Sequence, residues 1–270
     1  MTTRHPVAAR STKDPPSMRS PRIDSITRAA GLLVLVLAWQ ATCSSRLVSN
    51  LLVASPMAIA AWFANAVLHG TIWRDAGVTL ERVLIAFVIS AAIGVPTGLV
   101  MGSSKRVRLF FEFPIDFGRS IPATVLFPLF LIFFGAGEGS RIACAVYGAT
   151  LIILVSSMKG VQQANPTRLR SAQLCGARRL TLFLHVLLPE ALPSILTGFR
   201  LAVSLAFVIV VLVEMVVGTS SGLGHRMIEA QILYEIPEVY GLLVLSGTLG
   251  YLLNQVFVLV EARTCHYVGR

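Results

Sequence analysis

Long stretches without a charged residue are the feature that most constrains this chain. The stretch between Arg28 and Arg46 contains none, and several later stretches are as long or longer. About 20 predominantly apolar residues cross the hydrocarbon core of a bilayer as an α-helix. Only 13% of the 270 residues are charged, about half the share that is usual in soluble domains. The sequence therefore predicts an all-α membrane protein that crosses the bilayer several times.

We place six transmembrane helices in these segments. At about 1.5 Å per residue each can cross a core of about 30 Å, the shorter ones together with their flanks. The fifth segment is interrupted by Arg200 and Glu214. The predicted spans are Ala29–Ser45, Val83–Ser104, Ser120–Gly137, Ile142–Met158, Ala191–Gly218 and Val239–Val260.

A further uncharged segment, Leu47–Trp73, is a seventh candidate span. The distribution of Lys and Arg decides whether it crosses the membrane. With six spans and the N-terminus inside, 17 of the 23 Lys and Arg residues lie on the inner side, Arg119 among them, and Arg200 lies within a span. The five on the outer side are Arg46, Arg74, Arg82, Arg141 and Arg226. A seventh span would move Lys105, Arg106 and Arg108 outside, against the rule that cytoplasmic loops carry the excess of Lys and Arg. We therefore expect an amphipathic helix over Met57–His69 on the outer surface.

The same distribution explains the formal net charge of +10. The excess lies in the N-terminal segment and in short inner loops, so topology and anionic inner-leaflet lipid account for it, and no nucleic-acid partner is indicated. Residues 1–24 are rich in Pro, Ser, Arg and Thr, and we expect them to be disordered and cytoplasmic. The membrane domain is expected over 25–263, followed by a cytoplasmic tail over 264–270.

A short basic helix–glycine–helix element lies between the fourth and fifth predicted spans. Asn165 followed by Pro166 is a typical helix start, because asparagine caps the first turn and proline fits its first position. Gly176 can end this helix in a left-handed conformation. We expect a second helix over Ala177–Leu188 that ends at Pro189. The topology places this pair in the cytoplasm, where it can take force from a soluble partner.

Several segments, all in one register, resemble the permeases of binding-protein-dependent ABC importers. Gly176, Pro189 thirteen residues later and the Ala-Leu-Pro at 191–193 resemble the cytoplasmic EAA loop of this family, which makes 166–188 the coupling element. Three more segments resemble the branch that serves aliphatic sulfonates, taurine, nitrate and related small anions. They are RSIPATVLFPLFLIFFGAGEGSRI (119–142), LPSILTGFRLAVSLAF (192–207) and EMVVGTSSGLG (214–224).

The resemblance implies the type I ABC importer permease fold and a set of partners. Two permease chains, expected as a homodimer, would form the pore in a bacterial inner membrane. Two cytoplasmic ATPase subunits would bind ATP and Mg, and an extracytoplasmic binding protein would deliver the substrate. The sequence contains no Gly-x-x-x-x-Gly-Lys-Ser/Thr phosphate loop. We therefore expect no enzymatic activity and no cofactor in this chain.

The family pattern assigns the ATPase-coupling residues, with one departure. The glutamate of the Glu-Ala-Ala pattern falls on Arg170 and its first alanine on Ser171, whereas Ala172 and Gly176 match. The family's carboxylate is expected to contact the partner ATPase. Because Arg170 stands in its place, this chain presents the opposite charge at that position. The predicted coupling residues are Arg168, Arg170, Ser171, Ala172, Gly176, Ala177, Arg178 and Pro189.

Arg200 and Glu214 are the charges predicted to lie within a span. Ionisable groups at membrane depth are costly, so they usually face protein or water. Fourteen residues, about 21 Å, separate them, so they cannot pair within one helix. Arg200 is expected to reach the interface or to pack. Glu214 is expected either to make structural hydrogen bonds or to line a pathway or gate with Ser220, Ser221 and Gly222 of the outer loop.

Three questions stay open at this point. Gly94, Gly98 and Gly102 can allow close helix contact either at a dimer seam or within one subunit. The substrate is not identified, because the outer loops carry five basic and six acidic residues; a pyrimidine-type vitamin precursor is an alternative to the anions. A stand-alone secondary transporter is the alternative from another class, although no inverted repeat is visible.

No histidine or cysteine has metal-ligand spacing.

Overall fold

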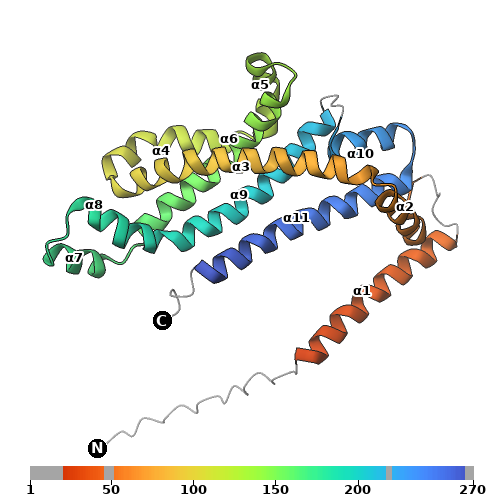
Figure 1. Cartoon of the computed structure of the whole chain (residues 1–270), viewed down its shortest axis with the longest axis horizontal. Coiled ribbons are helices and arrows are strands. Elements are labelled where there is room, and N and C mark those ends of the chain that lie inside the picture. The colour runs from red at the N-terminus through yellow and green to blue at the C-terminus, as the bar shows by residue number, and fades with distance from the viewer. Residues whose placement is uncertain (1–20, 46–51, 217–220, 265–270) are drawn as a thin grey trace, which may run out of the picture. The chain divides into compact units, whose positions relative to one another are not determined.

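The computed structural model describes residues 21–45, 52–216 and 221–264. Every regular element within these ranges is a helix, which confirms the predicted all-α class. The α-helices are α1 (Pro21–Ser44), α2 (Pro56–Leu68), α3 (Thr71–Ser103), α4 (Lys105–Ser120), α5 (Phe127–Phe134), α6 (Glu138–Gln162), α7 (Pro166–Leu174), α8 (Arg179–Leu182), α9 (Leu188–Val216), α10 (Leu223–Ile232) and α11 (Ile236–Thr264), as labelled in Figure 1.

The chain divides into two compact units, Met1–Pro56 and Met57–Arg270. Within the first unit, α1 covers nearly all of the predicted span Ala29–Ser45. Most of the large apolar side chains described on this helix are exposed, which suits a helix surrounded by lipid. Residues 1–20 of the predicted disordered segment and most of the C-terminal tail lie outside the described residues. The last four residues of that segment, 21–24, were predicted wrongly, because they begin α1.

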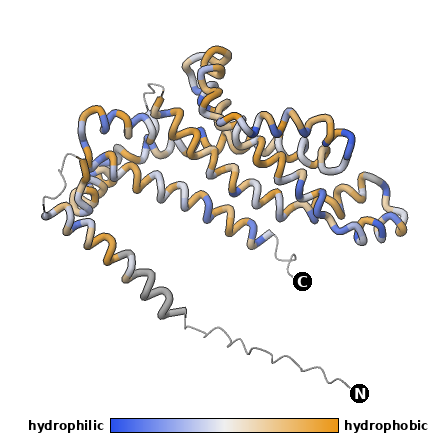
Figure 2. Tube along the Cα trace, turned by 180° about the vertical axis from the view of Figure 1, so that it is seen from behind, coloured by the Kyte–Doolittle hydropathy of each residue, from blue (hydrophilic) through white to orange (hydrophobic). Residues whose placement is uncertain are grey.

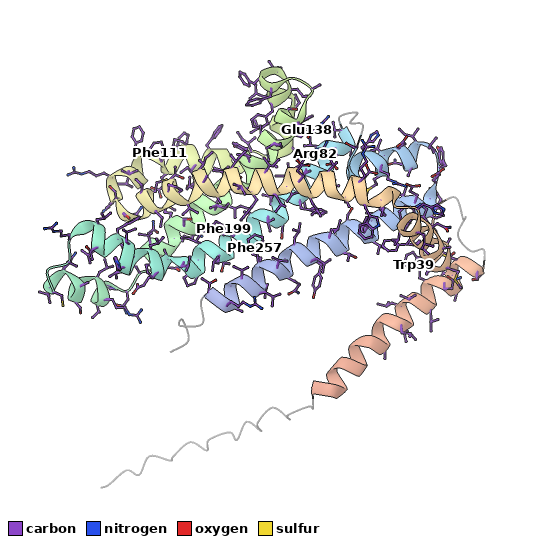
Figure 3. All side chains as sticks on the ribbon, in the orientation of Figure 1. Trp39, Arg82, Phe111, Glu138, Phe199 and Phe257 are labelled. Carbon is purple, nitrogen blue, oxygen red and sulfur yellow. The ribbon has the colours of Figure 1, made fainter. Side chains whose placement is uncertain are left out.

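Helices α3, α6 and α9 form the core of the second unit and lie side by side (Figure 1). Their shared core is rich in buried alanines, which let helices approach closely. Phe87 of α3 meets the rings of Phe199 on α9 and Phe257 on α11 edge to face, with ring centroids 5.2 and 5.1 Å away (Figure 3). Helix α11 thus packs against the core from one side.

The glycines spaced four apart on α3 serve contact within the subunit. A Cβ added at Gly98 would lie 2.4 Å from the carbonyl oxygen of Leu154 on α6. Gly94 and Gly102 face Ile153 and Val161 of the same helix at similarly short range. Of the two roles left open by the sequence, the structure therefore supports packing of α3 on α6.

Four described helices are long and apolar enough to cross a membrane: Ile72–Ser103, Glu138–Gln162, Leu180–Val216 and Ile236–Thr264. They correspond to the second, fourth, fifth and sixth predicted spans. In Figure 2 hydrophobic residues run along these helices, and hydrophilic residues gather at the end that holds α7 and α8. This pattern agrees with a multi-pass membrane protein whose polar connecting element lies at one membrane face.

The third predicted span, Ser120–Gly137, was wrong as a straight helix. The chain instead forms a pair, Lys105–Ser120 and Ala123–Phe134, bent by 88°. Ile121 is extended and Pro122 has no N–H to continue the helix, so α4 ends there. Arg119, which the charge count placed in the inner loop, lies about 21 Å along α4 from its start.

The second short helix of the basic element also differs from expectation. Pro189 does not end it; the chain runs from α8 through a π-helical turn, Phe183–Leu187, directly into α9. In the π turn the N–H of Leu188 bonds to the carbonyl of Phe183, which shifts the hydrogen-bond register just before the proline. Proline then occupies the first turn of α9, where its missing N–H is tolerated.

The helix expected over Met57–His69 is present as α2. It packs through Trp62, Phe63 and Ala66 onto a second hydrophobic cluster that includes Leu223 of α10 and Leu242 of α11. A Cβ at Gly241 of α11 would lie 2.1 Å from the Trp62 ring, so this glycine is what allows the indole to approach.

Candidate functional site

The coupling element begins with a capped helix. The side chain of Asn165 accepts a hydrogen bond from the backbone N–H of Thr167 at 2.9 Å, as its position predicted. Gly176 has φ 76°, the left-handed conformation expected of a helix end. The N–H groups of Gly176 and Ala177 then bond back to Gln173 and Ala172, which satisfies the last carbonyls of α7. Helix α7 is therefore a short unit with both ends fixed.

A contact that the sequence did not suggest ties α7 to α9. Glu190, in the first turn of α9, accepts a hydrogen bond from the backbone N–H of Asn165. Its other oxygen lies 3.2 Å from Nη1 of Arg168. Arg168 is thus paired within the chain, although two thirds of its side chain stays exposed. The sequence around Glu190 did not indicate this contact, because both partners of Glu190 lie more than 20 residues away in the sequence.

The remaining predicted coupling residues gather on one exposed element. Four of them are exposed: Arg170, Ser171, Gly176 and Arg178. Two of their neighbours are half-buried, Ala172 and Ala177. Pro189 is half-buried in α9. The surface around α7 is therefore basic, and Arg170 lies in it without any long-range contact among the described hydrogen bonds and ion pairs.

A charge network joins the outer parts of α3, α6 and α9, and all of its members except the half-exposed Glu138 are buried. Arg82 of α3 is 4% exposed, and its Nε and Nη2 atoms bind both oxygens of Glu138 at 2.6 and 2.7 Å (Figure 3). Its Nη1 atom lies 2.6 Å from Oε1 of Glu214 on α9. Arg141 of α6 adds a further bond of 2.6 Å to Glu138. Two carboxylates and two guanidinium groups thus balance each other.

Glu214 lies at the centre of this network and is 1% exposed. Besides Arg82, it accepts hydrogen bonds from the hydroxyl of Thr79 and from the backbone N–H of Gly224 at 3.0 Å. The carbonyl oxygen of Ser221 accepts from Arg82 at 3.0 Å. Of the two roles considered for Glu214, the structural one is therefore present: this carboxylate anchors the chain that enters α10.

Gly222 is required at this anchor. It has φ 123°, and a Cβ there would lie 2.6 Å from the carboxyl carbon of Glu214. Its N–H donates to Asp75 of α3 at 3.0 Å. Ser221 and Gly222 of the predicted gate therefore lie beside Glu214, while Ser220 is outside the described residues.

The expectation that Arg200 and Glu214 are the charges within the spans was incomplete. Arg82 and Arg141 had been assigned to outer loops, but both lie inside long apolar helices and are buried. Arg200 is half-exposed and has an ion pair of 3.8 Å with Glu261 of α11. Arg141 and Glu138 are three residues apart on α6, but the partners of Arg82, Glu214 and Arg200 lie on other helices, so no local pattern reveals those pairings.

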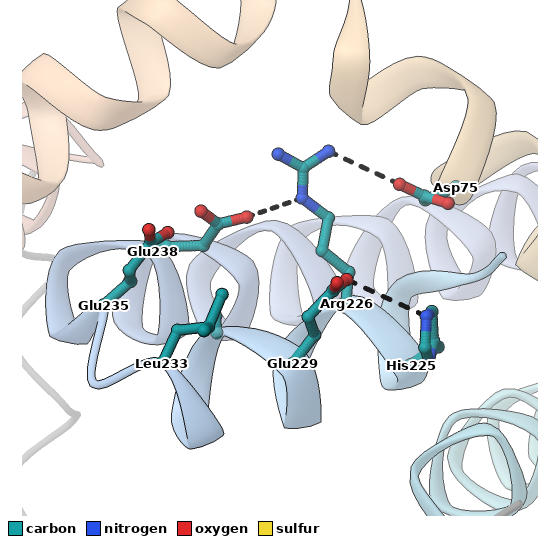
Figure 4. Close-up of a pocket in the computed structure, with 8 residues that line it drawn as sticks. Asp75, His225, Arg226, Glu229, Leu233, Glu235 and Glu238 are labelled. Atoms are coloured by element: carbon teal, nitrogen blue, oxygen red, sulfur yellow. Dashed lines mark hydrogen bonds and ion pairs between the residues drawn. The ribbon is translucent and has the colours of Figure 1, made fainter. Parts of the chain in front are cut away.

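Next to the network, a cavity of about 250 Å³ opens between α10 and α11 (Figure 4). Arg226 spans it, with Nε 2.6 Å from Glu238 and Nη1 3.4 Å from Asp75. Burial acts to lower the pKa of Arg226, but these two carboxylates outweigh it and raise the pKa above its usual value. A hydrogen bond with Glu238, together with its negative charge, raises the pKa of the neighbouring Glu235. The cavity is predominantly acidic.

Known proteins are similar in sequence to most of this chain. Residues 94–263 match the family described as binding-protein-dependent transport system inner membrane component. The taurine transport system permease protein TauC of Escherichia coli (strain K12) is 30% identical over 77% of this chain and 78% of its own length. The putative aliphatic sulfonates transport permease protein SsuC of Bacillus subtilis (strain 168) is 26% identical, over 85% and 83%. The nitrate import permease protein NrtB of Synechocystis sp. is 27% identical, over 90% of each chain.

The fold is also shared with a solved transporter. A chain of the inward-facing MetNI methionine ABC transporter superposes with a TM-score of 0.62 at 20% identity, covering 69% of this chain and 92% of that one. The expected type I importer permease fold is thus confirmed, and permeases of this kind work in general with ATPase and binding-protein partners. The chain belongs to the family of binding-protein-dependent transport system inner membrane components and is a multi-pass permease of an ABC importer.

Proposed function

We propose that this permease forms, as a homodimer, the pore of a bacterial inner-membrane importer for small anions of the sulfonate, taurine or nitrate class. The names of the relatives TauC, SsuC and NrtB support this substrate class. Both chain ends lie in the cytoplasm, as the excess of Lys and Arg in the inner segments favours. Two separate ATPase subunits bind ATP and Mg, and an external binding protein delivers the anion.

The observation that carries the coupling role is the tie between α7 and α9. Glu190 holds the start of α7 at one end of α9, and Glu214 anchors the buried network near the other end. The two glutamates are separated by about 36 Å along one helix. An ATPase groove that seats α7 would therefore act on α9 directly and move the outer network with it. The coupling residues are those on the exposed surface of α7 and its capping turn.

At the outer end, the anchored loop at 221–224 serves as the gate element. Glu214 does not bind the anion; it holds Ser221, Gly222 and Gly224 in position through its hydrogen bonds and through Arg82. The acidic cavity beside Arg226 lies on the same side of the unit, since Asp75 contacts both. We assign this face to contact with the binding protein.

The test is reconstitution of the permease with its partner ATPase and binding protein. ATP-dependent uptake of labelled taurine, ethanesulfonate and nitrate into proteoliposomes is measured, with a thiamine-type pyrimidine as the alternative substrate. Uptake of one of the anions that needs both partners supports the proposal. Uptake of the pyrimidine alone would reassign the substrate, and uptake by the permease without its ATPase would favour a secondary transporter.

A further inference from the structure

Helix α4 has a charged face opposite an aromatic one. Arg108, Glu112, Asp116 and Arg119 follow at intervals of four, four and three residues, which places them on one side of the helix. The opposite side carries exposed phenylalanines at 110, 113 and 117. Charged side chains on a helix that packs beside membrane-spanning helices usually face water or protein rather than lipid. The charged face of α4 therefore marks a hydrated side of the bundle.

The end of this face lies at membrane depth. The hydroxyl of Tyr147 donates to the carbonyl oxygen of Gly118 at 2.8 Å. Tyr147 is near the middle of α6, about 14 Å from the start of that helix. Arg119, next to Gly118, is therefore level with the middle region of a membrane-spanning helix. At that depth its guanidinium is remote from the lipid headgroups.

Two cavities meet at Arg119. The larger, of about 350 Å³, is lined by Tyr147 and Gly148 of α6, by Thr124 after the bend, and by apolar residues of α9. The smaller, of about 200 Å³, is lined by the rest of the charged face and by Lys159 near the other end of α6. Arg119 lines both. The side chain thus stands between a mainly apolar chamber and a charged one that leads toward the coupling element.

The guanidinium is only loosely held. Its ion pair with Asp116 is 3.7 Å long, beyond hydrogen-bonding distance, and the two side chains are 50% and 66% exposed. By contrast, Arg82 is nearly buried and bonded at 2.6 Å. Arg119 therefore keeps donors that can bind a ligand, and guanidinium forms a two-pronged contact with oxyanions.

We propose that Arg119 is the anion-binding residue of the translocation pathway. A small oxyanion such as a sulfonate or nitrate occupies the larger cavity and accepts hydrogen bonds from the Arg119 guanidinium, while any short alkyl part packs on the apolar lining. The volume lies at the lower end of the roughly 300–1,000 Å³ usual for ligand pockets, which suits a small solute. Asp116 takes over the guanidinium as the anion leaves toward the smaller cavity. This inference rests on the proposed function and names the residue that binds the negatively charged group of the substrate.

The test uses the full complex of permease, ATPase and binding protein in proteoliposomes, with taurine, ethanesulfonate and nitrate as probes. Arg119→Gln removes the charge, and Arg119→Lys keeps it without the planar fork. Arg106→Gln, in the first turn of the same helix, is the matched control. We expect Arg119→Gln to lower the initial rate of import by about tenfold or more, as the loss of a charge-assisted hydrogen bond does. The import rate of Arg119→Lys should lie between those of Arg119→Gln and the wild type, and the rate of the Arg106→Gln control should stay near that of the wild type.

ATP hydrolysis stimulated by the loaded binding protein separates binding from assembly. We expect it to stay within about twofold of wild type in Arg119→Gln, because the variant still assembles and cycles. Import of a probe at the wild-type rate by Arg119→Gln would overturn the inference and leave the proposed function standing. An equal loss of import and hydrolysis would also overturn it, since Arg119 would then act on assembly. If the wild type imports none of the probes, the proposed substrate class itself fails and the inference falls with it.

Discussion

The close contact between α3 and α6 can be tested with the same substitution at two places on α3. Gly98→Ala puts a methyl group 2.4 Å from the carbonyl oxygen of Leu154, a backbone atom in the middle of α6. Gly77→Ala, the matched control, puts it where nothing lies within 4 Å. The first variant must push two packed helices apart, whereas the second meets no obstacle.

The magnitudes follow from these two environments. Alanine favours an α-helix over glycine by about 0.5–1 kcal/mol, and both variants receive this gain. Overpacking in a tight core costs about 1–3 kcal/mol, and here the obstacle is backbone that cannot rotate away. Gly77→Ala should therefore be slightly more stable than wild type and Gly98→Ala less stable. For a unit of this size the two midpoints should differ by roughly 3–10 °C.

The measurement is thermal unfolding of the purified permease in detergent, followed by tryptophan fluorescence. A midpoint for Gly98→Ala equal to or above that of Gly77→Ala would refute the reasoning, because it would mean that α3 and α6 are not in contact at this position. Gly98→Leu extends the series and should not yield folded protein.

The remaining predictions concern the charge network and the coupling element. Glu214→Gln leaves Glu138 as the one counter-charge shared by the buried Arg82 and Arg141, so we expect a loss of about 3–5 kcal/mol, seen as a lower unfolding midpoint; the double variant with Arg82→Gln should recover part of it, and no recovery would argue against direct pairing. Gly176→Val forces a β-branched residue to positive φ, strained by about 1–3 kcal/mol, and should weaken pull-down of the ATPase while membrane insertion stays normal. Arg170→Glu restores the family's charge, yet should weaken binding to an ATPase groove that has adapted to a cation; binding at or above the wild-type level would contradict that adaptation. Cys175, exposed after α7, should resist an impermeant thiol reagent added to intact cells and react in inverted vesicles, and labelling from outside would reverse the topology.

The features that could be predicted from the sequence are those with a local cause. Apolar runs located most of the long helices, because crossing about 30 Å of hydrocarbon requires them. Asn165 and Gly176 predicted the two ends of α7, because an N-cap and a left-handed residue each bond to backbone groups within one turn of the helix end. These signals need no knowledge of the rest of the fold.

The features that were missed depend on contacts between distant residues. Arg82 and Glu214 are 132 residues apart, so each had to be judged alone, and Arg82 was assigned to a loop. The same limit applies to Pro189, whose effect was cancelled by a π turn that precedes it. The bend after Ser120 was missed because residues 120–134 carry no charge and so meet the composition expected of a span, although the helices on either side of Ile121–Pro122 differ in direction by 88°.

The balance of charges in the network around Arg82 has an electrical consequence. Arg82 and Arg141 contribute two positive charges, and Glu138 and Glu214 contribute two negative ones. An unbalanced charge that crossed the membrane field would exchange about 2.3 kcal/mol per 100 mV with it. A neutral cluster that moves as one body exchanges almost none. The voltage dependence of transport should therefore reflect the charge of the cargo, and the gating motion of α9 should proceed equally well in energised and de-energised membranes.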